Sequence, residues 1–136
     1  MAGRLQLEIV THERRVLAAA VDEVIARGAS GEFGVLPGHT HFVTTLLPGV
    51  LRYRDGDRWF DLAVAGGIAR VLDDKVLILA KAAERPDEID VERAERSAQR
   101  ARARLAQLSY YDKDADKMLL RLQRALIRLQ LASRKK

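Results

Sequence analysis

Hydrophobic and polar residues alternate at the start of the chain. Leu5, Leu7 and Ile9 are apolar, and the two residues between them are polar. A period of two predicts a half-buried strand over residues 4–10. Residues 14–27 are interpreted as two further short strands, because β-branched residues flank the alanine run at 18–20. One longer helix through that run is the alternative. The core candidates of this segment are Val16, Val21, Val24 and Ile25.

Glycine and proline divide the next part of the chain into short segments. Residues 31–49 read GEFGVLPGHTHFVTTLLPG, in which Pro37-Gly38 and Pro48-Gly49 are each a strong turn signal. The other turn signals are residues 28–31, Asp55-Gly56, Gly66-Gly67 and Asp73-Asp74. Turns that recur every ~8–12 residues between short apolar segments are typical of an antiparallel sandwich. We therefore expect an antiparallel β-sandwich or flattened barrel over residues 1–85.

The hydrophobic period changes at Pro86. Asp87 is a candidate helix cap, and Asp90 is an alternative cap one turn later. Apolar residues then step by four, three, four and three, as one stripe on a helix does: Ala94, Ala98, Ala101, Leu105 and Leu108. After a polar break at 109–113, a second stripe repeats these steps: Ala115, Leu119, Leu122, Leu126 and Leu129. The pattern predicts an antiparallel two-helix hairpin over residues 86–136, so the fold class is α+β.

The second helix has more apolar surface than the first can cover. A further row, formed by Leu120, Ile127 and Leu131, accompanies its stripe. The first helix offers mainly alanine, which buries far less apolar area than leucine. We therefore expect the second helix to pack on the β domain or on a partner protein as well.

Composition narrows the functional classes. The 136 residues include no cysteine, which excludes disulfides and thiolate metal sites. Residues 1–84 carry ten Lys/Arg and eleven Asp/Glu, whereas residues 85–136 carry fourteen and eight, so the net charge of +5 resides in the tail. No apolar run approaches the ~18–20 residues that cross a bilayer, so no direct membrane insertion is expected and a cytosolic location is the default.

Patterns typical of catalysis or metal binding are weak. Ser30 lies in a turn, with no nucleophile motif around it. His39 and His41 lack a third metal ligand at a recognisable spacing, and His39 is expected to hydrogen-bond the turn after Pro37-Gly38. Asp73-Asp74 is expected to form a hairpin turn. The sequence therefore indicates no catalytic residue, no metal and no prosthetic group, and it does not indicate an enzyme.

The order of the segments resembles a known family. The run at 31–49, then GGIARV at 66–71, VLILAKAAE at 76–84 and a helical tail resemble the epsilon subunit of bacterial F-type ATP synthases. Phe33 and His41 depart from the family, which usually has Leu and Pro or an apolar residue there. The resemblance implies a non-catalytic central-stalk subunit that contacts the gamma subunit and the membrane c-ring and transmits rotation. It also implies a peripheral location at the cytoplasmic face of the bacterial inner membrane.

A basic face follows the second helix. It consists of Lys117, Arg121, Arg124 and Arg128, with Lys113 before it and Lys135 and Lys136 at the chain end. Such a face can simply be solvated, or it can dock on an acidic partner, either nucleic acid or protein. The scarcity of stacking aromatics argues against nucleic acid, which stays the alternative. The resemblance implies that the extended tail presses this face on an acidic segment of beta, within the alpha/beta catalytic subunits, and so blocks ATP hydrolysis.

The junction between the two parts resembles a nucleotide site. Glu84, the run Ile89-Asp90-Val91-Glu92-Arg93-Ala94, and Arg100 match the pattern of ATP-sensing epsilon subunits: Glu, then Ile/Leu-Asp-x-x-Arg-Ala, then Arg seven residues after the first. Arg124 and Arg128 fit the second-helix arginines of that pattern, with Arg121 as an alternative. Arginines can bind phosphate oxygens through charge-assisted bonds, and carboxylates can accept from adenine or ribose. In the competing interpretation Asp90 caps the helix and Glu95 pairs with arginines. The resemblance implies ATP as a regulatory ligand.

Overall fold

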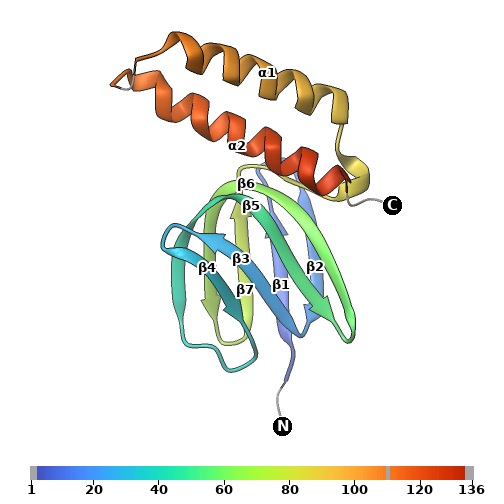
Figure 1. The fold of residues 1–136 in the computed structure, drawn as a ribbon. Coiled ribbons are helices and arrows are strands. Elements are labelled where there is room, and N and C mark those ends of the chain that lie inside the picture. The colour runs from blue at the N-terminus through green and yellow to red at the C-terminus, as the bar shows by residue number, and fades with distance from the viewer. Residues whose placement is uncertain (1–2, 110, 134–136) are drawn as a thin grey trace.

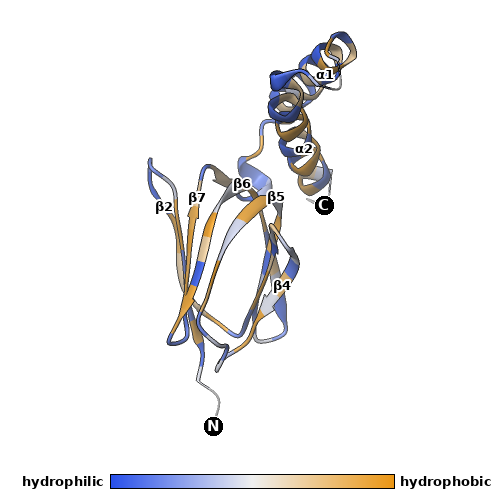
Figure 2. Ribbon diagram, turned by 90° about the vertical axis from the view of Figure 1, so that its left-hand side faces the viewer, coloured by the Kyte–Doolittle hydropathy of each residue, from blue (hydrophilic) through white to orange (hydrophobic). Residues whose placement is uncertain are grey.

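The computed structural model describes residues 3–109 and 111–133, and its strands precede its helices. The strands are β1 (Leu5–Val10), β2 (Arg15–Val21), β3 (Glu23–Gly28), β4 (Gly31–Val35), β5 (Phe42–Asp55), β6 (Arg58–Leu72), β7 (Lys75–Ala80) and β8 (Ala83–Glu84). A 3-10 turn (Pro86–Glu88) leads to α1 (Val91–Gln107) and α2 (Lys113–Ser133). The strands form a two-layered sandwich, and the antiparallel helices lie across one end of it (Figure 1, Figure 2). The expected α+β class is confirmed.

The sheet is not antiparallel throughout. Its strands follow the order β2-β1-β7-β6-β5-β3-β4, and β8 pairs with β6. All neighbours are antiparallel except β1 and β7, which pair in parallel from Gln6↔Lys75 to Val10↔Leu79. The expectation of a wholly antiparallel sandwich is therefore wrong at this one pair. The parallel pair joins two hairpins that are distant in the sequence, β1–β2 and β6–β7.

Buried and exposed side chains alternate along the first strand, as its sequence pattern predicts. Leu5, Leu7 and Ile9 are fully buried, as the alternation predicts. Residues 14–27 form strands β2 and β3, so the alternative of one longer helix is wrong. Val16, Val21 and Val24 lie in the core, but Ile25 does not. It is only half-buried because alternate residues of a strand face opposite sides, and Ala26 takes the inward position after Val24.

Two expected turns are bends inside long strands. Pro48-Gly49 lies within β5, opposite Val64 and Ala65, and Gly66-Gly67 is the next pair of residues within β6. Gly66 and Gly67 have φ values of +101° and +134°, a region that favours glycine. Arg27 Nη1 donates to the carbonyl oxygen of Pro48 at 3.2 Å, where the pairing of β3 with β5 shifts register. Proline and glycine thus mark a bend here and not a chain reversal. The turns at 28–31, Pro37-Gly38, Asp55-Gly56 and Asp73-Asp74 are confirmed.

The first long helix begins at the later of the two candidate caps. Pro86–Glu88 forms the 3-10 turn, so Asp87 lies inside that turn and does not cap α1. Asp90 is the N-cap, and its Oδ1 accepts from the backbone N–H of Arg93 at 3.1 Å. A carboxylate at this position accepts a hydrogen bond from an otherwise unpaired backbone amide. Its negative charge is also stabilised by the positive end of the helix dipole.

The hairpin packs through alanine, and α2 also packs on the sandwich. Ala94, Ala98 and Ala101 of α1 are buried against α2, as the first stripe predicts. In the second stripe Leu119 and Leu126 are 45% and 38% exposed, so their expected burial is wrong. The helix is instead rotated so that Ala125 is buried and Leu131 joins Ala63 and Ile89 in a second core cluster. The expectation that α2 packs on the β domain is confirmed.

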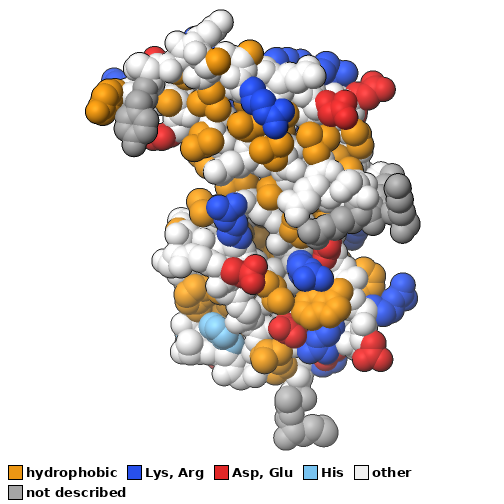
Figure 3. Space-filling model, in the orientation of Figure 1, with side chains coloured by type: hydrophobic (Ala, Val, Ile, Leu, Met, Phe, Trp, Pro, Cys, Tyr) orange, Lys and Arg blue, Asp and Glu red, His pale blue; other side chains and the backbone are white. Residues whose placement is uncertain are grey.

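The molecule narrows between the two parts. Hydrophobic side chains remain visible over the hairpin, and one side of the junction is hollowed (Figure 3). No helix within residues 3–109 and 111–133 is long and apolar enough to cross a membrane.

Candidate functional site

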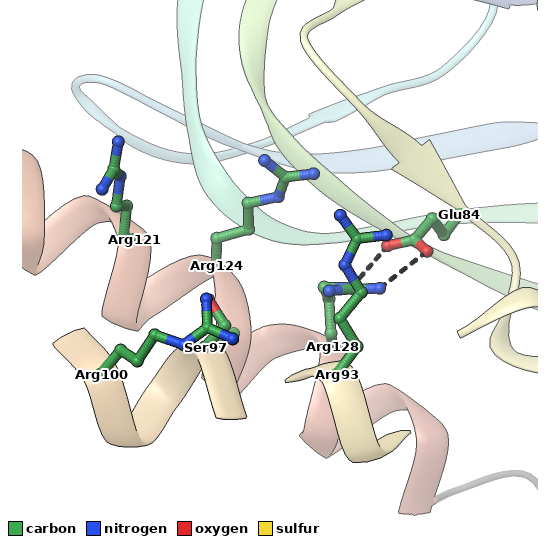
Figure 4. A pocket seen from close by; sticks show the side chains of 8 residues that line it. Glu84, Arg93, Ser97, Arg100, Arg121, Arg124 and Arg128 are labelled. Carbon is green, nitrogen blue, oxygen red and sulfur yellow. Dashed lines mark hydrogen bonds and ion pairs between the residues drawn. The ribbon is translucent and has the colours of Figure 1, made fainter. Parts of the chain in front are cut away.

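A cavity lies where both helices meet the last strand of the sandwich. Its volume is about 400 Å³, and it is lined by Glu84 of β8, by Arg93, Ser97 and Arg100 of α1, and by Arg121, Arg124, Ala125 and Arg128 of α2. The three elements come from the end of the β domain and from both arms of the hairpin (Figure 4). The cavity therefore exists only while the hairpin is folded against the sandwich.

Glu84 and Arg128 form an ion pair inside this cavity. Arg128 Nε lies 2.6 Å from Glu84 Oε1, and Arg128 Nη2 donates to Glu84 Oε2 at 3.1 Å (Figure 4). The two side chains are only 13% and 23% exposed. The Nε atom is buried, and no acceptor is aligned for its hydrogen bond. One arginine of the cavity is therefore compensated in charge by the glutamate, through two of its nitrogen atoms.

The remaining arginines of the cavity have no acidic partner among the described residues. Arg93, Arg100, Arg121 and Arg124 make no ion pair there. Arg93 lies next to the Glu84–Arg128 pair, and Arg121 and Arg124 extend from α2 toward the strands (Figure 4). Several guanidinium groups around one hollow repel one another unless an anion occupies it, and their planar donors fit phosphate oxygens.

The structure separates the residues of the nucleotide pattern into two groups. Glu84, Arg93, Arg100, Arg124 and Arg128 line the cavity together. The other three, Ile89, Asp90 and Ala94, do not line it. Ile89 is buried with Leu131, Asp90 caps α1, and Ala94 is fully buried in the seam. These three residues set the position at which α1 starts, and with it the direction of Arg93.

Two lining residues come from outside the quoted pattern. Ser97 follows Arg93 by one turn, so helical periodicity could have placed it on the same face. Ala125 is the small residue that lets the helices approach each other, and its position depends on the rotation of α2. Arg121, considered only as an alternative, lines the cavity beside Arg124.

The basic face of α2 points largely into this junction. Arg121, Arg124 and Arg128 line the cavity, and Lys117 lines an adjoining groove against β5 and β6 together with Arg121 and Arg124. The distal Lys135 and Lys136 lie outside the described residues. In the folded hairpin the basic face is therefore turned toward the protein's own sandwich.

The histidines have structural partners. His39 Nδ1 lies 2.7 Å from the carbonyl oxygen of Thr40, which agrees with the expected bond to the turn. His41 Nε2 lies 3.1 Å from Asp73 Oδ1. Within the described residues there is no group of three or more His, Cys, Asp or Glu that could hold a metal ion.

The connection into α1 is held by Glu88. Its Oε1 accepts from the backbone N–H of Arg85 at 2.9 Å, and its Oε2 accepts from Arg14 Nη2 at 2.9 Å. These bonds, first that of the Arg85 amide and then that of Arg14, lower the pKa of Glu88 although burial opposes the shift. The carboxylate thereby ties the interdomain turn to the loop between β1 and β2.

The sequence matches two family models along its length. Residues 4–86 match the beta-sandwich domain of the ATP synthase delta/epsilon chain, and residues 87–133 match its long alpha-helix domain. The ATP synthase epsilon chain of Geobacter metallireducens is 48% identical over 134 residues, which are 98% of this chain and 97% of the relative. That of Syntrophobacter fumaroxidans is 47% identical over 135 residues, covering 98% and 99%.

A solved structure shows the same fold. A chain of the mitochondrial ATP synthase of Euglena gracilis, solved as OSCP/F1/c-ring, superposes with a TM-score of 0.78 at 26% identity, over 93% of this chain and 80% of that chain.

The sandwich, the hairpin and the full-length relatives define a non-catalytic accessory subunit of ATP synthase. The chain belongs to the ATP synthase delta/epsilon family, and its relatives of known name are bacterial epsilon chains. The resemblance to the epsilon subunit is thus confirmed.

Proposed function

We propose that this chain is a central-stalk subunit whose helical hairpin inhibits ATP hydrolysis and is held in its folded, non-inhibitory form by ATP. One observation carries this proposal: the cavity between β8, α1 and α2 gathers five arginines around one glutamate. It contains five of the eight residues of the expected ATP pattern, drawn from three separate elements.

The residues that line the cavity suit the binding of a nucleoside triphosphate. Arg93, Arg100, Arg121 and Arg124 supply donors for phosphate oxygens, and Ser97 adds a hydroxyl. Arg128 stays paired with Glu84 and adds its positive charge to the surroundings of a phosphate chain. Glu84 is the acidic residue available to accept from the adenine amine or a ribose hydroxyl.

The position of the cavity couples the ligand to the state of the hairpin. A ligand that binds only the folded form stabilises it by RT ln(1 + [L]/Kd). The hairpin seam is largely alanine, so the helices alone contribute little to the docked state. Falling ATP then releases α2, and the basic face formed by Lys117, Arg121, Arg124 and Arg128 becomes available to an acidic segment of a beta subunit.

The sandwich supplies the surfaces for the stalk. Val43, Ile68 and Leu79 are 67%, 46% and 48% exposed, and Ile68 pairs directly with Leu79. Val43 stands opposite Arg70 on the same outer face. Exposed apolar residues on neighbouring strands are typical of a protein contact, and we assign this face to the gamma subunit. The turn at Pro37-Gly38, which connects β4 to β5 at the end away from the hairpin (Figure 1), is assigned to the c-ring, at the cytoplasmic face of the inner membrane.

The test is a calorimetric titration of the full chain with MgATP. Arg93→Ala should weaken binding at least tenfold, as expected for loss of a charge-assisted bond. Arg102→Ala removes the same charge from an exposed position of α1 outside the cavity and should leave the affinity unchanged. Absence of saturable binding at millimolar ATP, or equal losses in both variants, would refute the ATP site.

The inhibitory role has to be tested in the assembled ATP synthase. Because the chain has no cysteine, Val50→Cys and Ile127→Cys, both in the cluster between α2 and the sandwich, can be joined by a short bismaleimide. Locking the hairpin should raise ATP hydrolysis of the complex at low ATP, and uncrosslinked enzyme serves as the control. Inhibition that persists after complete crosslinking contradicts the proposed switch.

A further inference from the structure

The cavity described above does not end at Arg100 and Arg121. A second cavity of about 300 Å³ continues along the seam between α1 and α2, toward the loop that connects them. It is lined by Ser97, Arg100, Ala101, Arg104, Met118 and Arg121. Ser97, Arg100 and Arg121 also line the first cavity, so the two cavities share a wall. The site is therefore open beyond the residues that would hold the end of a triphosphate.

The second cavity differs in chemistry from the first. It gains only one cation, Arg104, whose Nη2 already lies 3.9 Å from Asp114 Oδ2. Its floor is apolar, formed by buried Ala101 and half-buried Met118. A further phosphate would gain little here. A flat heterocycle fits better, because guanidinium planes stack on aromatic rings and a thioether packs favourably against them.

The geometry points to a dinucleoside polyphosphate as a ligand of the joined cavities. One base lies at the Glu84 end, the phosphate chain lies among the arginines of α1 and α2, and the second base lies on the floor formed by Ala101 and Met118. From Arg93 to Arg104 the site follows α1 over a rise of about 16 Å, at 1.5 Å per residue. This inference rests on the proposed nucleotide site and extends it by a second base subsite.

The second base would strengthen the regulatory effect. It contacts α1 and α2 on the side of the first cavity that lies toward their connecting loop, whereas the Glu84–Arg128 pair lies toward the sandwich. A ligand bound at both ends of the seam therefore holds the hairpin closed over more of its length than ATP does. At the same free concentration, the ligand with the lower Kd stabilises the folded form more, by RT ln(1 + [L]/Kd).

The test compares three ligands of the full chain by calorimetry: ATP, adenosine tetraphosphate and diadenosine tetraphosphate. Adenosine tetraphosphate has the same number of phosphates and more negative charge, but no second base. We expect diadenosine tetraphosphate to bind about fivefold tighter than adenosine tetraphosphate, as one cation–π stack would give. Charge alone would produce the opposite order.

Variants locate the effect. Met118→Ala and, separately, Arg104→Ala should remove the preference for diadenosine tetraphosphate over adenosine tetraphosphate. Arg102→Ala, which lies on α1 but lines neither cavity, should keep it. If ATP binds but diadenosine tetraphosphate binds no tighter than adenosine tetraphosphate, this inference is overturned and the ATP site stands. If no ligand binds, both are overturned. If Arg102→Ala loses this preference as fully as Arg104→Ala does, the preference comes from diffuse charge attraction, and the second base subsite is also overturned.

Discussion

Arg128 Nε lies 2.6 Å from Glu84 Oε1, and this ion pair joins the second helix to the last strand of the sandwich. The two side chains are mostly shielded from solvent, and both line the arginine-rich cavity. The pair therefore has two roles. It holds α2 in place, and it sets the charge balance of the site that we assign to a nucleotide.

Replacing Glu84 by Gln should loosen the hairpin. Arg128 would keep its largely buried position without a countercharge, which costs about 1–3 kcal/mol in the docking of α2. Native-state hydrogen exchange should show faster exchange of α2 amides while the sandwich amides stay protected. Glu95→Gln removes one negative charge from an exposed position of α1 and serves as the matched control. Unchanged α2 protection in Glu84→Gln would contradict the docking role.

Asp90 should act through the start of α1. Asp90→Ala removes the acceptor of the Arg93 amide and should lower stability by about 1 kcal/mol, measured by urea denaturation. Asp90→Asn keeps a good N-cap and should be near wild type. ATP affinity should fall with Asp90→Ala, because fraying of the first turn displaces Arg93. If Asp90→Asn keeps its stability but loses ATP binding, the carboxylate must instead contact the nucleotide directly.

Gly67 should tolerate no side chain. A Cβ there would lie 2.0 Å from the carbonyl oxygen of Leu79 and 2.9 Å from Ala80 Cα, at a φ of +134°. Because both obstacles are backbone atoms, Gly67→Ala should destabilise the sandwich by ~3 kcal/mol or more. Gly34→Ala is the control, since its nearest neighbour would be 4.0 Å away. Guanidinium denaturation of both variants measures the difference, and similar midpoints would show that β6 and β7 can separate at this point.

The turn at Glu88 should weaken in acid. The folded-state pKa of Glu88 is lowered from its ordinary value of 4.5, so its contribution to stability is complete above about pH 4.5 and is lost as pH falls through the folded pKa. The difference in unfolding free energy between wild type and Glu88→Gln should therefore be constant near neutrality and shrink below pH 4.5. A difference independent of pH down to pH 3 would show that the carboxylate charge is not what holds the turn.

The outer face of the sandwich should be needed for assembly. Ile68→Glu or Leu79→Glu should leave the isolated protein folded, because both side chains are nearly half exposed. Either change should strongly reduce binding to the gamma subunit, since it places a charge in the proposed apolar contact. Val91→Glu alters an exposed apolar residue at the start of α1 and is the control for added charge. Pull-down or sedimentation with gamma measures the effect, and normal assembly of Ile68→Glu removes this face from the proposed interface.

Much of the fold can be predicted from local chemistry. The alternation of Leu5, Leu7 and Ile9 predicts β1 and its buried face, and four of the six turn signals mark real turns, three of which close hairpins. The failures are at Pro48-Gly49 and Gly66-Gly67. There the residues that favour turns occupy bends of two paired strands, and only the pairing partner decides whether the chain reverses or continues.

The candidate site was accessible to sequence reasoning only in part. Glu84, Arg93 and Arg100 are identified through the resemblance to ATP-sensing epsilon subunits, and helical periodicity by itself places only Arg93 and Arg100 on one face of α1. Ser97 could have been added by the same periodicity. Arg124 and Arg128 are preferred to Arg121 on the sequence pattern, but all three line the cavity, because the rotation of α2 against its neighbours turns all of them toward it.

The sequence by itself determined the division into a strand-rich part and a helical hairpin and the location of the positive charge. These depend on periodicity and on contacts between near neighbours in the chain. Only the tertiary structure decided that β1 pairs in parallel with β7, that Leu119 and Leu126 face solvent, and that Glu84 neutralises Arg128 across 44 residues. Such features depend on which surfaces meet once the chain has collapsed, and local patterns do not specify them.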